Sequence, residues 1–166
     1  ETKDEMGSSH YNLINNCIGN RVPIVDPEKG LEIFNKISEA AQKGLLRACH
    51  DCSEGGIGVS LAEMAFAGGL WVEAYLDKVP ITGEGWRVKG ERDVIALFSE
   101  SNTRFIAEVR KADKKKFEEA MKGAETGLAG EVTSQKSFIV YGLENKKIID
   151  INIEKLKEAW QKPLRW

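Results

Sequence analysis

Residues 48–69, ACHDCSEGGIGVSLAEMAFAGG, constrain the fold of this chain more than any other stretch. An extended segment ending near Asp51 leads directly into the glycine pair Gly55-Gly56, and small apolar residues follow at 57–67. Glycines permit a sharp turn and a close backbone approach. A helix that is apolar on most of its sides has to be buried. The sequence therefore predicts a strand, a tight turn and a buried helix that ends at glycine.

The same stretch holds Cys49 and Cys52 in C-x-x-C spacing, with His50 between them. Along an extended strand these two cysteines point to opposite faces, and a tetrahedral zinc site needs four ligands. The remaining soft ligands, His10 and Cys17, lie far away in sequence. The turn also separates the pair from the helix N-terminus that would lower a thiol pKa. We predict that both cysteines are small packing residues, with a zinc or redox protein as the alternative.

The turn after the strand allows two interpretations. The N-terminus of the next helix offers free amides and a positive dipole end to an anion. Asp51 and Glu54 could then hold a metal ion that bridges to phosphates. Equally, Ser53 could cap the helix after a tight turn, with no ligand at all.

A second polar cluster, FSESNTR at residues 98–104, follows a helical pattern. Its hydroxyl groups, one carboxylate and one arginine could line a polar ligand site. We predict that Ser99, Glu100 and Ser101 form a ligand-facing turn. The alternative is a capped turn with a purely structural role.

Helical and extended patterns alternate along the rest of the chain. Asp26-Pro27 is typical of a helix start, and Leu31, Phe34, Ile37 and Ala41 then recur at helical spacing until Gly44 closes the helix. Asp113 and Asn152 are candidate caps of later helices. The expected helices lie after 26, at 57–67, 91–101, 111–124 and 153–160, the expected strands at 45–51, 70–77, 104–109, 126–133, 137–143 and 146–152, and a loop at 81–91.

This order of elements predicts an α+β fold, a layered α/β/α domain with a mixed sheet. The 166 residues suffice for a substantial core, and the formal net charge is -2. A balance so close to neutral provides no basic face, so we expect no nucleic-acid partner. No apolar run approaches the roughly 20 residues that span a bilayer, so we expect no membrane partner. Three cysteines make no disulfide framework, which favours the reducing cytoplasm.

The opening residues, ETKDEMGSSHY, are polar, and the first of them, Glu1, is not methionine. They lack the apolar core of a signal peptide. We expect a fragment of a longer protein. Within it, we expect residues 1–25 to be the end of a preceding domain with a connecting segment, and 26–166 to be one domain.

Four segments together resemble one family, the large synthetase subunit of phosphoribosylformylglycinamidine synthase. HDCSEGGIGVSLAEMAFAGG resembles its HD-x-S-[DE]-GG-L-x-V-x-LAEMA signature, and ETKDEMGSSHY resembles its ETKDELGGSEY segment. LFSESNTRFIAEV is similar to LF-x-ES-x-x-RF-x-VEV, and IIDINIEKLKEAWQKPL resembles the closing helix. The four motifs occur in the family's order and cover nearly the whole chain.

The resemblance implies the C-terminal domain of the second of two tandem halves, each related to aminoimidazole ribonucleotide synthetase. The implied fold is a layered α/β domain that is partly ferredoxin-like. The implied parent is a purine-biosynthesis ligase. It uses ATP, Mg²⁺ and glutamine-derived ammonia to convert formylglycinamide ribonucleotide to the amidine.

The resemblance also implies that this chain carries no catalytic residue and no metal ligand, and that it is inactive alone. Its partners would be the N-terminal domains of the same enzyme and a glutaminase domain or subunit, and the isolated domain could form a homodimer. The residues implied to contact phosphate or a neighbouring domain are Asp51, Ser53, Gly55 and Gly56.

Some positions depart from the family pattern. The substrate-binding E-S-Q segment of the first half corresponds to 100–102, where Asn102 replaces glutamine. Gly7-Ser8 stands in place of a double glycine, and His10 in place of glutamate. An alternative from another class is a stand-alone, non-catalytic interaction or scaffold module. Selenophosphate synthetase, thiamin-phosphate kinase and the hydrogenase-maturation relative fit the motifs less well.

Overall fold

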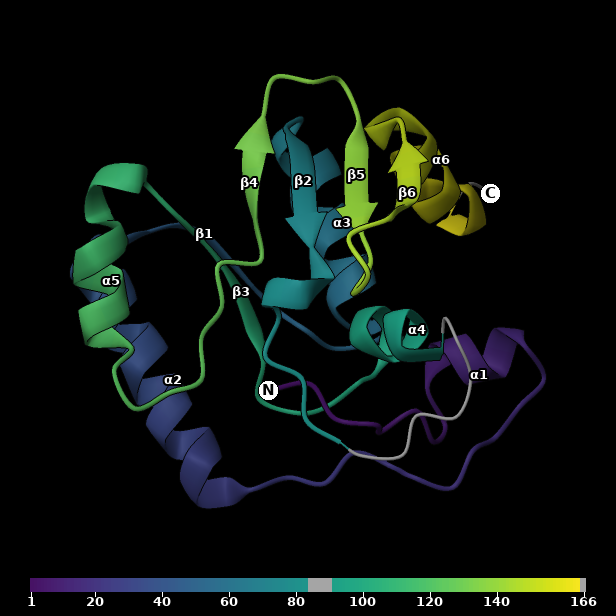
Figure 1. Ribbon diagram of the computed structural model, residues 1–166, viewed down its shortest axis with the longest axis horizontal. Helices are drawn as coiled ribbons and strands as arrows, with labels where there is room; N and C mark the ends of the chain where they lie inside the picture. The colour runs from purple at the N-terminus through teal and green to yellow at the C-terminus, as the bar shows by residue number, and fades with distance from the viewer. Residues whose placement is uncertain (84–90, 165–166) are drawn as a thin grey trace.

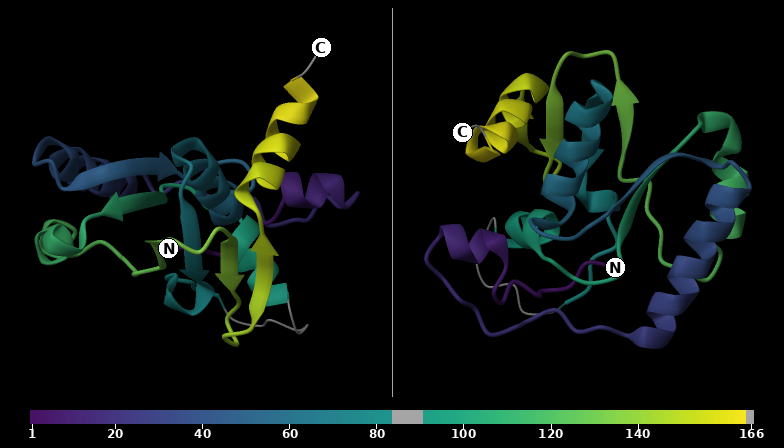
Figure 2. Two further views of the ribbon diagram at one scale, coloured as in Figure 1. Left: turned by 90° about the horizontal axis from the view of Figure 1, so that it is seen from above. Right: turned by 180° about the vertical axis from the view of Figure 1, so that it is seen from behind.

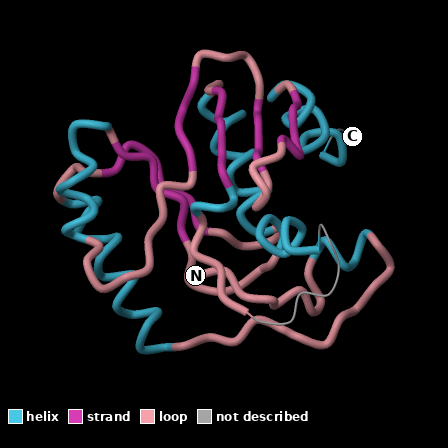
Figure 3. The backbone as a smooth tube through the Cα atoms, in the orientation of Figure 1, coloured by secondary structure: helices cyan, strands magenta, loops and turns pink. Residues whose placement is uncertain are grey.

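The computed structural model describes residues 1–83 and 91–164. Within these residues the strands form two sheets, one of two strands and one of four (Figure 1, Figure 3). The strands are β1 (Leu46–Asp51), β2 (Trp71–Tyr75), β3 (Phe105–Val109), β4 (Gly130–Thr133), β5 (Phe138–Tyr141) and β6 (Lys147–Ile151).

The helices lie between and after these strands. They are α1 (His10–Ile14), α2 (Pro27–Gln42), α3 (Gly56–Gly68), α4 (Glu91–Phe98), α5 (Lys114–Ala120) and α6 (Ile153–Gln161), with 3-10 turns η1 (Leu76–Lys78), η2 (Lys111–Asp113) and η3 (Lys162–Leu164). The sequence did not predict α1. No helix in the ranges 1–83 and 91–164 is apolar over enough length to span a membrane. Most of the loop predicted at 81–91 falls outside the described residues.

The four-stranded sheet has the order β4-β2-β5-β6 and is mixed. β2 and β5 run parallel, with Val72 opposite Phe138, while β2–β4 and β5–β6 are antiparallel. β1 and β3 pair antiparallel as a separate ribbon in which Asp51 lies opposite Phe105. The predicted α+β class with a mixed sheet is confirmed, and the strands divide between two sheets.

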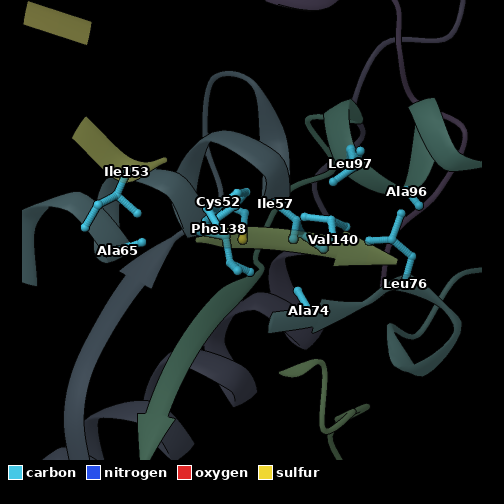
Figure 4. Close-up of a cluster of buried hydrophobic side chains, with 11 residues drawn as sticks. Cys52, Ile57, Ala65, Ala74, Leu76, Ala96, Leu97, Phe138, Val140 and Ile153 are labelled. Atoms are coloured by element: carbon cyan, nitrogen blue, oxygen red, sulfur yellow. The ribbon is translucent and has the colours of Figure 1, made fainter. Parts of the chain in front are cut away.

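The core lies where α3 crosses the four-stranded sheet. Ile57 on α3 packs with Phe138 and Val140 on β5, and with Leu97 on α4 (Figure 4). Ile153 at the start of α6 joins the same cluster. The low polarity of α3 on most of its sides is explained by this position, because sheet, α4 and α6 all contact it.

The predicted helix after Asp26 is present as α2, and two of the large apolar side chains on it are largely exposed. Leu31 is 63% exposed and Phe34 is 54% exposed, whereas Gly30 and Ala40 are buried. The helix lies beside α5, at the end of the molecule away from α6 (Figure 1, Figure 2). Among the described residues, Phe34 packs against Phe105 of β3, while Leu31 stays exposed.

Helix caps follow the predictions in two of three cases. The Asp26 carboxylate accepts a hydrogen bond from the Lys29 amide at 3.0 Å, and Asn152 accepts one from the Glu154 amide at 2.7 Å. Asp113 makes no side-chain cap to α5. Its carboxylate pairs with the Arg110 guanidinium at 3.1 Å, and this competing charge explains the wrong prediction.

The first residues of the chain join the body of the domain. The Thr2 amide donates to the Pro80 carbonyl at 2.8 Å, and the Thr82 amide donates to the Thr2 carbonyl at 2.8 Å. Thr2 also forms a parallel bridge with Ile81 and is 1% exposed. The division of the chain at residue 26 stays a prediction.

Leu76 tests the core directly, because it is 1% exposed while Leu128 is 63% exposed. Leu76→Ala should lower the free energy of unfolding by about 2–5 kcal/mol through lost burial and a residual cavity. The control Leu128→Ala should change it by less than about 0.5 kcal/mol. Urea unfolding followed by circular dichroism measures both, and equal effects would contradict this core.

Candidate functional site

The two polar segments predicted from the sequence meet in the structure. The glycine turn follows β1, and the turn at residues 99–104 precedes β3, which is the partner of β1. The pairing continues past the strands, because the Cys52 amide donates to the Arg104 carbonyl at 2.9 Å. Predicted residues that are about fifty positions apart therefore lie side by side.

The backbone of Gly56 makes the closest approach between the turns. Its φ is +60°, and a Cβ there would lie 2.7 Å from the Leu97 carbonyl oxygen and overlap that of Ser99. Gly55 has a φ of +74°, and a Cβ there would lie 2.9 Å from the Cβ of Val59. Both positions therefore need glycine, for conformation and for space.

The Glu100 carboxylate lies at the N-terminus of α3. Its Oε1 accepts hydrogen bonds from the Gly55 amide at 2.9 Å and from the His10 amide at 2.9 Å. The His10 Nδ1 lies 3.3 Å from the same oxygen. A negative group is stabilised at this end of a helix. An internal carboxylate therefore uses the Gly55 amide that a phosphate would need.

Ser99 and Ser101 do not face a ligand site, in contrast to the prediction. They are 0% and 2% exposed. The Ser99 hydroxyl donates to the Lys3 carbonyl at 2.6 Å, and the Lys3 amide donates to the Ser101 hydroxyl at 3.0 Å. These two serines hold the N-terminal segment, because alternate residues of the turn point inward while Glu100 points outward.

Arg104 organises this turn from inside, a role that the sequence did not reveal. Its Nε donates to the Ser101 carbonyl at 2.8 Å, Nη2 to the Ser99 carbonyl at 2.5 Å, and Nη1 to the Thr2 hydroxyl at 2.9 Å. The side chain is buried, and burial lowers the pKa of the guanidinium. An arginine in a polar turn looks like a surface residue in sequence, and only the fold shows its partners.

A hollow of about 620 Å³ opens between the two turns and α2. Asp51, Ser53 and Glu100 form part of its wall, and Phe34 contributes an apolar side. The Phe34 and Phe105 rings pack edge to face at 5.6 Å. The complete lining is Pro23, Phe34, Asp51, Cys52, Ser53, Glu54, Glu100, Asn102, Thr103, Arg104 and Phe105.

Asp51 is the carboxylate at the end of β1. The Ser53 hydroxyl donates a hydrogen bond to it, and this bond holds the pKa of Asp51 below its ordinary value. The Ser60 hydroxyl donates to the Asp51 carbonyl at 3.0 Å and so joins the strand end to α3. Ser53 therefore interacts with a carboxylate, and Gly55 takes the N-cap position of the helix with no side-chain cap.

The cysteines behave differently from one another. Cys52 belongs to the hydrophobic core, as predicted, whereas Cys49 is exposed on β1, so the prediction for Cys49 was wrong. Burial raises the pKa of the Cys52 thiol, and partial desolvation of the sulfur together with the nearby Asp51 carboxylate raises the pKa of the Cys49 thiol, although that residue is exposed; both shifts disfavour a reactive thiolate. His50 faces α3, with Nε2 3.2 Å from Glu63, and lies apart from the hollow.

The chemistry of the hollow does not fit a magnesium nucleotide held by this chain alone. Asp51, Glu54 and Glu100 would repel a bare phosphate, and the guanidinium of Arg104 already donates to three protein oxygens. Among the described residues, no group of three or more His, Cys, Asp or Glu side chains is placed to hold a metal ion. The hollow offers one acidic wall and one apolar wall.

Comparison with known families agrees with the motifs. The family described as AIR synthase related protein, C-terminal domain, matches residues 3–142. The chain belongs to this family. The chain is also 34% identical, over 161 residues, to phosphoribosylformylglycinamidine synthase subunit PurL of Methanocaldococcus jannaschii. That match covers 96% of this chain and 20% of the relative, so the chain spans about a fifth of the relative's length.

Solved structures show the same fold. The PurL of T. maritima, solved in complex with ATP, has a TM-score of 0.75 and 18% identity, covering 93% of this chain and 24% of that one. The hydrogenase maturation protein HypE of E. coli has a TM-score of 0.60 and 17% identity, covering 92% of this chain and 47% of that one. The fold is therefore shared by a PurL protein and a hydrogenase maturation protein.

Gly56→Ala tests the close approach of the two turns. Gly44 is a matched control, because its φ is +68° and no atom lies within 4 Å of a Cβ built there. Gly44→Ala should cost about 1–2 kcal/mol for the left-handed backbone alone. Gly56→Ala should cost a further roughly 1–3 kcal/mol for overpacking. Equal urea midpoints for the two variants would rule out the contact with Leu97 and Ser99.

Ser53→Ala should raise the pKa of Asp51 toward its ordinary value, because the donating hydroxyl is removed. In the natural chain, the pKa of Asp51 is lowered in the folded state. The bond from Ser53 therefore contributes its full stabilisation at pH values above the ordinary carboxyl pKa. The contribution is lost as the pH falls through the pKa of the folded state. Carboxyl carbon NMR titration measures the shift, and Ser38→Ala on α2 is the control. The same Asp51 titration in both variants would contradict the assignment.

Proposed function

We propose that this chain is the C-terminal domain of the second half of a phosphoribosylformylglycinamidine synthase. The parent would use ATP and glutamine-derived ammonia to convert formylglycinamide ribonucleotide to formylglycinamidine ribonucleotide. The observation that carries the proposal is the 34% identity to the PurL subunit over 96% of the chain. The match of 3–142 to the C-terminal domain family supports the placement within such a protein.

The role proposed for this domain is to supply one wall of a site. Gly55 and Gly56 fix the turn, and Glu100 ties it to the N-terminal segment through the amide of His10. The acidic wall of the hollow, formed by Asp51 and Glu100, is held in place by these backbone contacts. ATP and Mg²⁺ would be held by the N-terminal domains of the parent, since the hollow itself repels phosphate. Those domains, together with a glutaminase domain or subunit, are the proposed partners.

Inactivity of the isolated chain follows from this role. Among the predicted contact residues, the Ser53 hydroxyl has a carboxylate beside it, that of Asp51, but the lowered pKa of Asp51 makes it a weak general base. Among residues 1–83 and 91–164, no group of three or more His, Cys, Asp or Glu side chains is placed to hold a metal ion. A cytoplasmic setting stays a prediction.

The proposal predicts a clear difference between parent and domain. The full-length gene product, given formylglycinamide ribonucleotide, ATP, Mg²⁺ and ammonia, should release ADP and amidine product in equal amounts. The 166-residue chain should release neither above background. Coupled ADP detection and mass spectrometry of the product measure the two together.

A well-folded full-length product without turnover would refute the enzyme assignment and favour the scaffold module. Turnover by the isolated chain would refute the partial-site role, because one wall would then suffice. ADP release without amidine would identify an ATPase of the same fold, and would also contradict the proposed reaction.

A further inference from the structure

Large apolar side chains that are exposed cluster on one part of the chain. Single exposed apolar residues are ordinary, but a contiguous group of them marks an interaction surface. In the rest of the described chain, exposed large apolar side chains lie on separate elements, for example Leu70, Leu128 and Ile148. The docking edge, as we name the cluster, comprises Leu13, Ile14, Ile18, Val22, Ile24, Val25, Leu31 and Phe34.

The residues of the docking edge lie on one stretch of the chain, residues 13–34. The chain leaves α1, runs along one margin of the molecule and enters α2, as seen from the front in Figure 1 and from behind in Figure 2. The backbone of this stretch therefore forms one long border of the domain. The stripe of α2 that lacks a core partner, Leu31 and Phe34, is the last part of this border.

The backbone of the docking edge is held in place, although its side chains are exposed. The Gly7 amide donates to the Arg21 carbonyl at 2.6 Å, and the Ser8 amide donates to the Ile18 carbonyl at 2.7 Å. The Ile24 amide donates to the carboxylate of Glu5, itself buried, at 3.2 Å. A fixed backbone that presents apolar side chains loses little conformational entropy on binding.

The docking edge reaches the hollow. Phe34 belongs to both, and Pro23, beside Val22 and Ile24, lines the hollow as well. A surface that covers Pro23 and Phe34 would therefore also lie next to the hollow that Asp51 and Glu100 line.

We propose that the docking edge is covered by an apolar surface of a neighbouring domain of the same polypeptide. This inference rests on the proposed function, which places the chain in a longer protein. The M. jannaschii relative is about five times as long as the matched region, since the match covers 20% of it. A domain tethered to this one meets the edge at high effective concentration, which favours it over a second copy.

Hydroxyl-radical footprinting of the full-length gene product, read by mass spectrometry, tests the proposal. Leu31 and Leu128 are both 63% exposed in this domain, so equal oxidation is expected if neither is covered. Coverage of the docking edge should make oxidation of Leu31 several-fold slower than that of Leu128. Phe34, compared with partly buried Phe105 beside it, gives a second ratio within the same sample.

A Leu31 to Leu128 ratio near one in the parent would overturn the proposal. Protection that disappears on dilution, together with a mass change from dimer to monomer in light scattering, would assign the edge to a second copy and also overturn it. Protection of monomeric parent at every concentration would support coverage within one chain.

The same preparation separates this inference from the proposed function. Slow oxidation of Leu31 in a parent that does not convert formylglycinamide ribonucleotide would retain the docking edge and reject the ligase. Turnover with equal oxidation of Leu31 and Leu128 would retain the ligase and reject the docking edge.

Discussion

The contact between the Gly56 backbone and the carbonyls of Leu97 and Ser99 is the constraint on which the rest of the structure depends. It presses the start of α3 against the end of α4 with no side chain between them. α3 contacts both β2 of the four-stranded sheet and the ribbon of β1 and β3. Fixing the start of α3 therefore also helps to fix the position of the sheet relative to the ribbon. Arg104 then completes the junction by tying the Ser99 and Ser101 carbonyls to Thr2.

Much of this junction could be predicted from the sequence, since its signals are local. A glycine pair between an extended segment and a small apolar run predicts a tight turn, and Asp26-Pro27 predicts the start of α2. The mixed sheet followed from the order of elements. The meeting of the glycine turn with the 99–104 turn depended on the β1–β3 pairing, which no local pattern encodes.

The wrong predictions share a physical cause. The helical spacing of Leu31 and Phe34 shows that α2 has an apolar face, but not what covers it. Cys49 and Ser99 were misplaced because small side chains fit both surface and interior. Arg104 was missed because a buried cation is recognised only through its acceptors, which here are backbone carbonyls that any residue could supply.

The parallel pairing of β2 with β5 has a consequence for how the chain folds. Val72 meets Phe138 only after most of the sequence has been made, whereas β5 and β6 are neighbours that can form a hairpin locally. Closing so long a loop costs entropy before any sheet contact is gained. During synthesis, β2 and the apolar helix before it, α3, are therefore made before β5, the strand that pairs with β2 in the sheet. In that interval the nascent chain exposes Ile57 and Leu61, which the finished domain buries in its core.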